Sequence, residues 1–195
     1  MAVGRYKQLR EKNVFNEKFL IHGMLDQQSK VNLDLVKNHI LINFMKKNIY
    51  QDDQYWYMSD YFKIPYHQHI QWIQDWFRDH YFAEYGQSLI PTSVDSIRGQ
   101  VIQSGESINS HHNIKDTKLD QSPDVDVLFC LAAGSEKELS NCVFEFDNGR
   151  QKHRRWKVDM RPKRFYMFSS EIPRYVTRNK SKDFIVNLSL HFQIL

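Results

Sequence analysis

The chain has 195 residues, a length typical of one domain that buries its own core without disulfides or a structural metal. Its formal net charge is only +4 and 41% of its residues are hydrophobic, which excludes a highly charged disordered chain. Two cysteines exclude a disulfide framework, and no apolar run approaches the roughly 18 residues of a membrane span. The N-terminus lacks the apolar stretch of a secretory signal, so we expect one cytoplasmic domain over residues 1–195.

The first half of the chain predicts two helices. Residues 29–47 carry Leu33, Val36, Ile40 and Phe44 at helical spacing. Residues 66–85 repeat the pattern and end at Gly86, the residue type that most often caps a helix C-terminus. We therefore expect residues 1–90 to be mainly helical.

After Pro91 the periodicity changes to that of short strands separated by turn residues. The predicted strands cover residues 96–103, 125–132, 142–146, 156–160, 164–168 and 184–192. Helices followed by antiparallel strands indicate an α+β fold, a sandwich or open barrel over residues 91–195 with the helices on one outer face.

The last predicted strand alternates two kinds of side chain. The apolar set is Phe184, Val186, Leu188, Leu190 and Phe192, and the opposite face contains Asn187, Ser189 and His191. Such a polar face borders either solvent or a polar cavity.

Positive charge is concentrated late in the chain. Residues 150–182 contain twelve Lys or Arg against only Asp159 and Glu171. This pattern is typical of solvated strand edges, which basic side chains protect from pairing with other strands. It would also suit an acidic partner.

The order of several motifs resembles the prolyl-hydroxylase-like branch of the 2-oxoglutarate/iron(II) oxygenases, and proteins of this branch in T4-like cyanobacterial phages. The resemblance covers residues 66–192. It depends on the phrases Gly105-Glu-Ser-Ile-Asn-Ser-His-His112, Arg164-Phe-Tyr-Met-Phe-Ser-Ser170 and Asn187-Leu-Ser189. It implies a double-stranded β-helix, a jelly-roll-like fold, with iron(II) and 2-oxoglutarate as cofactors.

The resemblance places the first iron-binding histidine at His112 or His111. The carboxylate expected two residues later is missing, and Asp116 would replace it only if the loop folds back. The second histidine is replaced by Arg174, whose guanidinium is always charged and has no lone pair for a metal. We therefore expect Arg174 to fill the iron position and to pair with Asp116 or Asp126.

The co-substrate position is altered in the same way. Where the family has a basic residue that clamps 2-oxoglutarate, this chain has Asn187, two residues before Ser189. An amide cannot form the bidentate ion pair of a guanidinium, so any remaining clamp would need a nearby residue such as Arg178.

Two functions follow from the resemblance. One is an oxygenase with impaired or absent hydroxylase activity, in which His112 and Asp116 would have to bind iron in an unusual way. The other is a non-catalytic interaction module of a tailed-phage virion, in its neck or tail. In both cases we expect protein partners or a homo-oligomer, no membrane and no nucleic acid.

Overall fold

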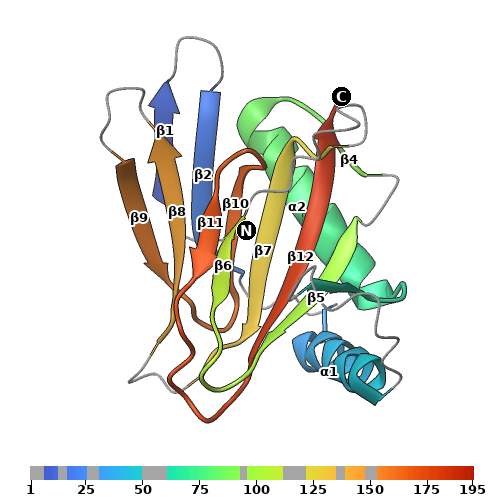
Figure 1. The fold of residues 1–195 in the computed structure, drawn as a ribbon. Helices are drawn as coiled ribbons and strands as arrows, with labels where there is room; N and C mark the ends of the chain where they lie inside the picture. Colours follow the sequence, from blue (N-terminus) through green and yellow to red (C-terminus); the bar gives the residue numbers. More distant parts are fainter. Residues whose placement is uncertain are drawn as a thin grey trace.

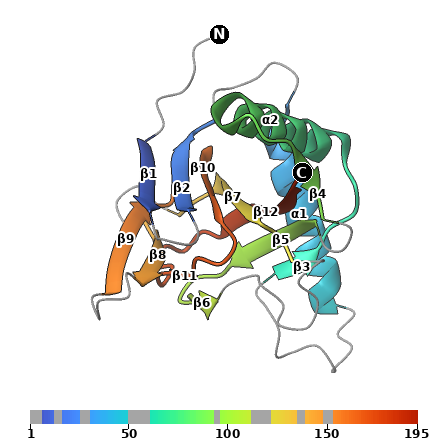
Figure 2. The same cartoon turned by 90° about the horizontal axis from the view of Figure 1, so that it is seen from above.

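The computed structural model describes residues 7–12, 17–25, 31–49, 61–92, 96–111, 122–134, 139–147 and 153–195. These residues form two antiparallel β-sheets that face each other, with two helices on the outer side of the larger sheet (Figures 1 and 2). The predicted sandwich with helices on one outer face is therefore confirmed.

The larger sheet has the order β1-β2-β10-β7-β12-β5-β3, and β4 pairs with β12 beside this path. Its strands are β1 (Lys7–Lys12), β2 (Glu17–Met24), β3 (Tyr61–Lys63), β4 (Leu89–Pro91), β5 (Ile97–Ile102), β7 (Val125–Ala132), β10 (Arg164–Ser169) and β12 (Ile185–Ile194). The smaller sheet has the order β6-β11-β8-β9. Its strands are β6 (Ile108–His111), β8 (Asn141–Asp147), β9 (His153–Asp159) and β11 (Arg174–Val176).

The last eight strands pair in a nested pattern. β8 pairs with β9, β7 with β10, β6 with β11 and β5 with β12, so the chain turns back on itself at β8–β9. Because each pair is antiparallel and successive pairs alternate between the two sheets, the ribbon winds into a sandwich. This is a jelly-roll-like arrangement.

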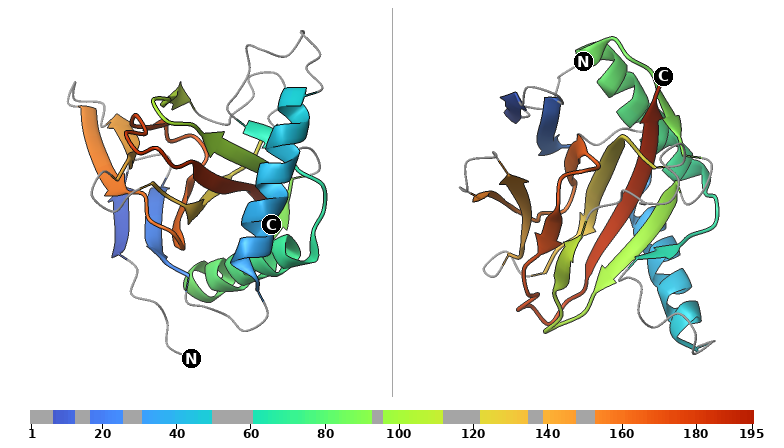
Figure 3. Two further views of the ribbon diagram at one scale, coloured as in Figure 1. Left: turned by 90° about the horizontal axis from the view of Figure 1, so that it is seen from below. Right: turned by 45° about the horizontal axis from the view of Figure 1, so that its top comes forward.

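The two helices are α1 (Leu33–Ile49) and α2 (Gln68–Tyr85). One stripe of α2 is buried, and it contains Ile70, Ile73, Phe77 and Tyr81. Gly86 caps α2 with φ = 68°, and its N–H donates to the Phe82 carbonyl oxygen, as the sequence predicts. Helix α1 contacts β5, β7 and β12, and α2 contacts β4 (Figure 3).

Two apolar clusters result, because the side chains of a strand alternate between its faces. One cluster lies between the helices and the larger sheet and contains Val127, Phe129, Leu188 and Leu190. The other lies between the sheets and contains Leu128, Cys130, Cys142 and Phe144. Both cysteines are buried and free.

The N-terminal part also contains strands beside its two helices, because β1, β2, β3 and β4 join the larger sheet. One prediction about the last strand was wrong. Phe184 does not join the apolar face of the last strand. It precedes β12 and is 40% exposed, and Ile185 begins the strand with its side chain between the sheets.

Neither helix in the described part of the chain combines the length and apolar character of a membrane span.

Candidate functional site

Three charged or titratable side chains meet between the two sheets. Asp126 lies on β7, His191 on β12 and Arg174 at the start of β11. Nη1 of Arg174 donates to Oδ2 of Asp126 over 3.3 Å, and Nδ1 of His191 lies 2.6 Å from Oδ1 of the same carboxylate. The side chains of Arg174 and Asp126 are 1% and 0% exposed. We call these residues the Arg174–Asp126–His191 cluster. Its ion pair, between Arg174 and Asp126, is removed from water.

The sheet register brings these three residues together. Asp126 and His191 are cross-strand partners on β7 and β12. Their side chains therefore emerge on the same face of the larger sheet, the face toward the smaller sheet. Arg174 reaches the carboxylate from the smaller sheet, so the ion pair joins the two layers.

Aromatic groups complete the surroundings of the guanidinium. Its central carbon lies 4.7 Å from the ring centroid of Phe168, a cation–π contact, and Nη2 is 3.5 Å from the hydroxyl oxygen of Tyr61. Burial by itself would lower the pKa of Arg174, but Tyr61 and Asp126 nearby raise it above its ordinary value. Arg174 is therefore a permanent cation in the centre of the fold.

The charge of Arg174 also affects its neighbours. Burial raises the pKa of the Tyr61 hydroxyl, and the positive charge of Arg174 only partly opposes this. Burial likewise raises the pKa of the Cys142 thiol to about 12. Tyr61 and Cys142 are neutral at physiological pH, so neither competes with Asp126 for the guanidinium.

His111 is the one predicted histidine ligand among the described residues. It ends β6 and is the direct cross-strand partner of Arg174. Its Nδ1 lies 2.9 Å from the Asn109 carbonyl oxygen, and its ring packs edge-on against Tyr61 at 5.3 Å between centroids. Of the two positions that the resemblance offers for the first histidine, the described one, His111, is thus adjacent to Arg174.

The other predicted ligands, His112 and Asp116, lie outside the described residues, as does Asn113. Of the two partners expected for Arg174, the described one, Asp126, forms the ion pair.

The residues that the structure describes do not fit an iron ion in the facial-triad geometry. That geometry needs two imidazoles and a carboxylate on one face of the metal. Arg174 offers no lone pair, and its positive charge repels a divalent cation. Both carboxylate oxygens of Asp126 are already engaged, by Arg174 and by His191. Within the described ranges, no group of three His, Cys, Asp or Glu side chains could hold a metal.

The predicted co-substrate residues lie in two different environments. Asn187 and Ser189 are fully buried on the inner face of β12, and the amide nitrogen of Asn187 donates to Gln100 Oε1 over 2.6 Å. Arg178 is exposed and donates through Nε to the Gly105 carbonyl oxygen at 2.8 Å, so it lies at the surface. Asn187 is thus paired with a neutral amide, and an anion clamp of the family's kind is not formed by these residues.

Asn187, Ser189 and His191 are all buried, so of the two alternatives for this polar face it is the interior one that the structure shows. Ser189 Oγ has no hydrogen-bond partner among the described residues. It lies on β12 between Asn187, which bonds Gln100, and His191, which bonds Asp126. The inner face of β12 is therefore a row of polar groups inside the sandwich.

Sequence reasoning missed two parts of the site, the bond from His191 to Asp126 and the aromatic walls of Phe168 and Tyr61. A signal for the first was present, because Asp126 interrupts the apolar run from Val125 to Leu131. A buried carboxylate needs donors, and the alternating polar face of the last strand supplies one. Tyr61 is distant in sequence, and no local pattern indicates its position.

No protein-family profile and no curated protein sequence matches the chain. Solved structures do. The fold is similar to that of the non-heme alpha-ketoglutarate-dependent carbocyclase SnoK from nogalamycin biosynthesis. The TM-score is 0.61 at 11% sequence identity, with 89% of this chain and 78% of that chain covered.

Two prolyl hydroxylases are similar as well. A prolyl hydroxylase from Trichoplax adhaerens, solved with a peptide of hypoxia-inducible factor, gives a TM-score of 0.59 at 11% identity over 88% of this chain and 83% of that chain. The Pseudomonas putida prolyl-4-hydroxylase gives 0.52 at 11% identity over 98% and 94%. Such low identities concern the fold and not the chemistry. The chain therefore has the mostly antiparallel, helix-covered β-sandwich fold found in 2-oxoglutarate-dependent oxygenases.

Proposed function

We propose that this chain is an oxygenase-like double-stranded β-helix protein in which a buried ion pair takes the place of the iron site. On this proposal it does not hydroxylate substrates by the family's mechanism, and its fold serves as a binding module. The observation that carries the proposal is the Arg174–Asp126 pair, completed by His191 and shielded from water.

The nested strand pairing supports the fold part of the proposal. In a double-stranded β-helix one long antiparallel ribbon is wound into two facing sheets. The pairs β8–β9, β7–β10, β6–β11 and β5–β12 describe such a ribbon. Arg174 begins β11 beside His111 at the end of β6, and His111 is one of the two positions that the resemblance offers for the first histidine.

The chemistry of the cluster supports the loss of iron-dependent catalysis. An arginine at the second histidine position removes a nitrogen ligand and adds a positive charge. At short range and an effective dielectric constant near 20, repulsion of a divalent cation amounts to several kcal/mol. Asn187 bonded to Gln100 also offers 2-oxoglutarate no charged clamp, so we expect only weak binding of this acid.

The competing function is an iron(II)/2-oxoglutarate dioxygenase in which His112 and Asp116 supply ligands in a non-standard arrangement. An assembly role in the neck or tail of a phage virion is a narrower form of our proposal, and its support is the sequence resemblance alone.

The test is metal binding. The protein is purified without oxygen, incubated with iron(II) with and without 2-oxoglutarate, desalted, and assayed for bound iron by mass spectrometry. We expect far less than one iron per chain in both cases. One iron per chain, or iron binding strengthened by 2-oxoglutarate, would refute the proposal.

A pair of variants adds a positive control. Arg174→His combined with Asn113→Asp restores the ligand types, whereas Arg174→Met removes the charge without adding a ligand. We expect the double variant to bind more iron than Arg174→Met, because positions 111 and 174 are cross-strand partners. Equal iron contents in two folded variants would contradict the assignment of Arg174 to the metal position.

A further inference from the structure

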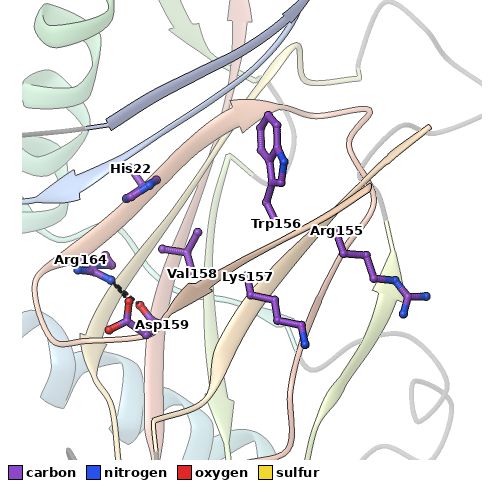
Figure 4. Close-up of a pocket in the computed structure, with 7 residues that line it drawn as sticks. All are labelled: His22, Arg155, Trp156, Lys157, Val158, Asp159 and Arg164. Atoms are coloured by element: carbon purple, nitrogen blue, oxygen red, sulfur yellow. Dashed lines mark hydrogen bonds and ion pairs between the residues drawn. The ribbon is translucent and has the colours of Figure 1, made fainter. Parts of the chain in front are cut away.

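A second polar feature lies at the β9 edge of the smaller sheet. A groove of about 530 Å³ runs between β9 on one side and β2 and β10 on the other (Figure 4). Its lining residues are His22, Arg155, Trp156, Lys157, Val158, Asp159 and Arg164. The groove belongs to neither the Arg174–Asp126–His191 cluster nor the residues predicted to bind cofactors.

Among the described residues, no strand pairs with β9 on the groove side. β9 is the last strand of the smaller sheet, and within the described ranges only β8 pairs with it. Met160 N–H donates to the Ser140 carbonyl oxygen at 2.8 Å. In β9 it is therefore the even-numbered residues whose backbone N–H and C=O groups point toward β8. In an antiparallel ladder the intervening residues direct N–H and C=O the other way. Arg155 and Lys157 therefore present both backbone groups to the open edge.

The open edge ends at Asp159. Its carbonyl oxygen accepts hydrogen bonds from the Tyr166 hydroxyl at 2.8 Å and from Arg164 Nη1 at 3.0 Å. Both donors come from β10, so this part of the edge is already satisfied within the molecule. An added strand would pair with the stretch around Arg155 and Lys157.

The charge around this stretch is positive. Arg155, which is 58% exposed, pairs with Glu145, while Arg161 and Arg164 share the single carboxylate of Asp159. Lys157 is exposed and is the fourth cation of the group. Among the described residues of this group, four cationic side chains stand against two carboxylates, an excess that favours an acidic ligand.

The two faces of β9 differ, as Figure 4 shows for Trp156 on one side and Arg155 and Lys157 on the other. Trp156 packs on Phe146 with 3.9 Å between ring centroids and remains partly exposed beside the groove. An extended segment lying along β9 would place alternate side chains beside the basic face and beside the indole.

We propose that the open edge of β9 binds an extended acidic segment of a partner protein as an added antiparallel strand, with carboxylates facing Arg155 and Lys157. This inference rests on the proposed use of the fold as a binding module and names the chemistry of its partner. Failure of peptide binding would refute only the proposed partner. Turnover that depends on iron and 2-oxoglutarate would refute the proposed function itself.

The probe is a fluorescein-labelled peptide of alternating glutamate and valine, seven residues long, and binding is followed by fluorescence anisotropy with the full chain. Comparison peptides have lysine in place of glutamate, or carry N-methyl groups on alternate residues so that one edge cannot donate hydrogen bonds. We expect the acidic peptide to bind, with an affinity that falls as salt rises, and both comparison peptides to bind about tenfold more weakly or worse. Equal binding of the N-methylated peptide would overturn strand addition.

The matched variants are Lys157→Glu in the groove and Lys180→Glu, an exposed lysine elsewhere, which change the net charge equally. Lys157→Glu should weaken binding about tenfold or more, and Lys180→Glu should leave it unchanged. Equal affinities of the two variants would overturn the site. A thymidine oligonucleotide that displaces the peptide and binds more tightly would show a polyanion surface and would also overturn the proposal.

Discussion

Arg174 is the largest fully buried side chain of the described residues, and its charge makes its burial the most demanding feature of the fold. A guanidinium removed from water is tolerated only where a carboxylate and further contacts replace its hydration. Asp126 supplies the opposite charge and the Phe168 ring supplies a cation–π contact. Removal of either charged partner leaves an uncompensated charge in the interior.

The first prediction concerns Arg174→Met. This variant keeps much of the volume but leaves the Asp126 carboxylate buried without the guanidinium. We expect the free energy of unfolding to fall by about 3–5 kcal/mol, as is typical when one partner of a buried pair is removed. Urea denaturation followed by circular dichroism measures it.

The matched control for Arg174→Met is Arg155→Met. Arg155 also pairs with a carboxylate, that of Glu145, but at an exposed site, where such pairs contribute about 0–1 kcal/mol. If the two variants lost similar amounts of unfolding free energy, burial would not explain the contribution of the Arg174–Asp126 pair.

A second prediction uses the double variant of Arg174→Met and Asp126→Asn. Asp126→Asn removes the buried negative charge that the guanidinium no longer balances in the single Arg174→Met variant. The double variant should therefore be more stable than the sum of the two single losses implies, with a coupling energy of about 1–3 kcal/mol. A double-mutant cycle in urea gives this value, and strict additivity would argue against a direct interaction.

For single residues, the sequence predicted that Arg174 occupies the site, but it did not predict most of the side chains around it. The resemblance and the rule that buried charges are paired predicted a carboxylate partner for Arg174, either Asp116 or Asp126. The bond of Asp126 to His191 depends on the register of β7 against β12, which local patterns do not determine. Arg178 lies at the surface, where it bonds to Gly105, a residue 73 positions away in the sequence.

The elements are held in place by particular caps and close contacts. Helix α2 begins after His67, whose side chain accepts a hydrogen bond from the His69 N–H at 3.3 Å. The His67 ring lies 5.0 Å from that of His39 on α1 and 5.3 Å from that of His69. Three imidazoles thus meet where α1 packs beside the start of α2.

The third prediction is a loss of stability in acid that depends on His67. Burial and the neighbouring His39 and His69 lower the pKa of His67 below 6.5 in the folded state. A lowered pKa means that the folded state binds fewer protons than the unfolded state. The stabilisation is present above pH 6.5 and is lost as the pH falls through the lowered value.

The measurement is the melting temperature between pH 7.5 and pH 5 for the wild type and for His67→Asn. Asparagine is a good N-cap and does not titrate, so the variant should lose less stability in acid. His80, whose pKa burial also lowers, contributes equally to both proteins and cancels in the comparison. Parallel pH curves for the two proteins would exclude His67 as the origin.

A fourth prediction concerns Gly99 on β5. A Cβ atom at this position would lie 2.8 Å from the Phe62 ring and 3.0 Å from Ile40 of α1. Glycine therefore allows β3 and α1 to approach β5 closely. Gly99→Ala should lower the free energy of unfolding by about 1–3 kcal/mol, as overpacking of a core does. Gln103→Ala, at an exposed position just after the same strand, should leave it nearly unchanged, and equal effects would contradict the packing argument.

The sequence predicted long elements well and short ones poorly. The strand expected at residues 125–132 is observed as Val125–Ala132, and the second helix ends at Tyr85 as expected. β3, β4, β6 and β11 have only three or four residues, too few for a period of two to be recognised. β1 contains the sequence Lys-Gln-Leu-Arg-Glu-Lys, and its pairing with β2 decides its conformation against a weak local preference.

For the whole molecule, segments from both halves of the chain build each apolar cluster. β2 pairs with β10, and β3 pairs with β5, so the N-terminal strands extend the sheet made by the C-terminal half. Both helices cover the outer face of that sheet. Sheet order of this kind comes from contacts between distant segments, which is why periodicity predicted the strands but not their neighbours.

The last prediction is that residues 91–195 do not fold without residues 1–90. The shorter chain keeps β5 to β12 but loses Val36, Ile40, Ile70 and Phe77, which bury the outer face of the larger sheet. Without them a wide apolar surface around Phe129 and Leu188 would face water, at a loss of roughly 25 cal/mol for each Å² exposed. The edge of β10 that pairs with β2 would also be open to aggregation.

The measurement compares urea unfolding of the full chain with that of the fragment 91–195. We expect one cooperative transition for the full chain and none for the fragment. The fragment should bind a hydrophobic dye, and it should regain structure when residues 1–90 are added as a separate chain. A cooperative transition of the fragment alone would mean that the sandwich is an independent unit and that the helices are an accessory layer.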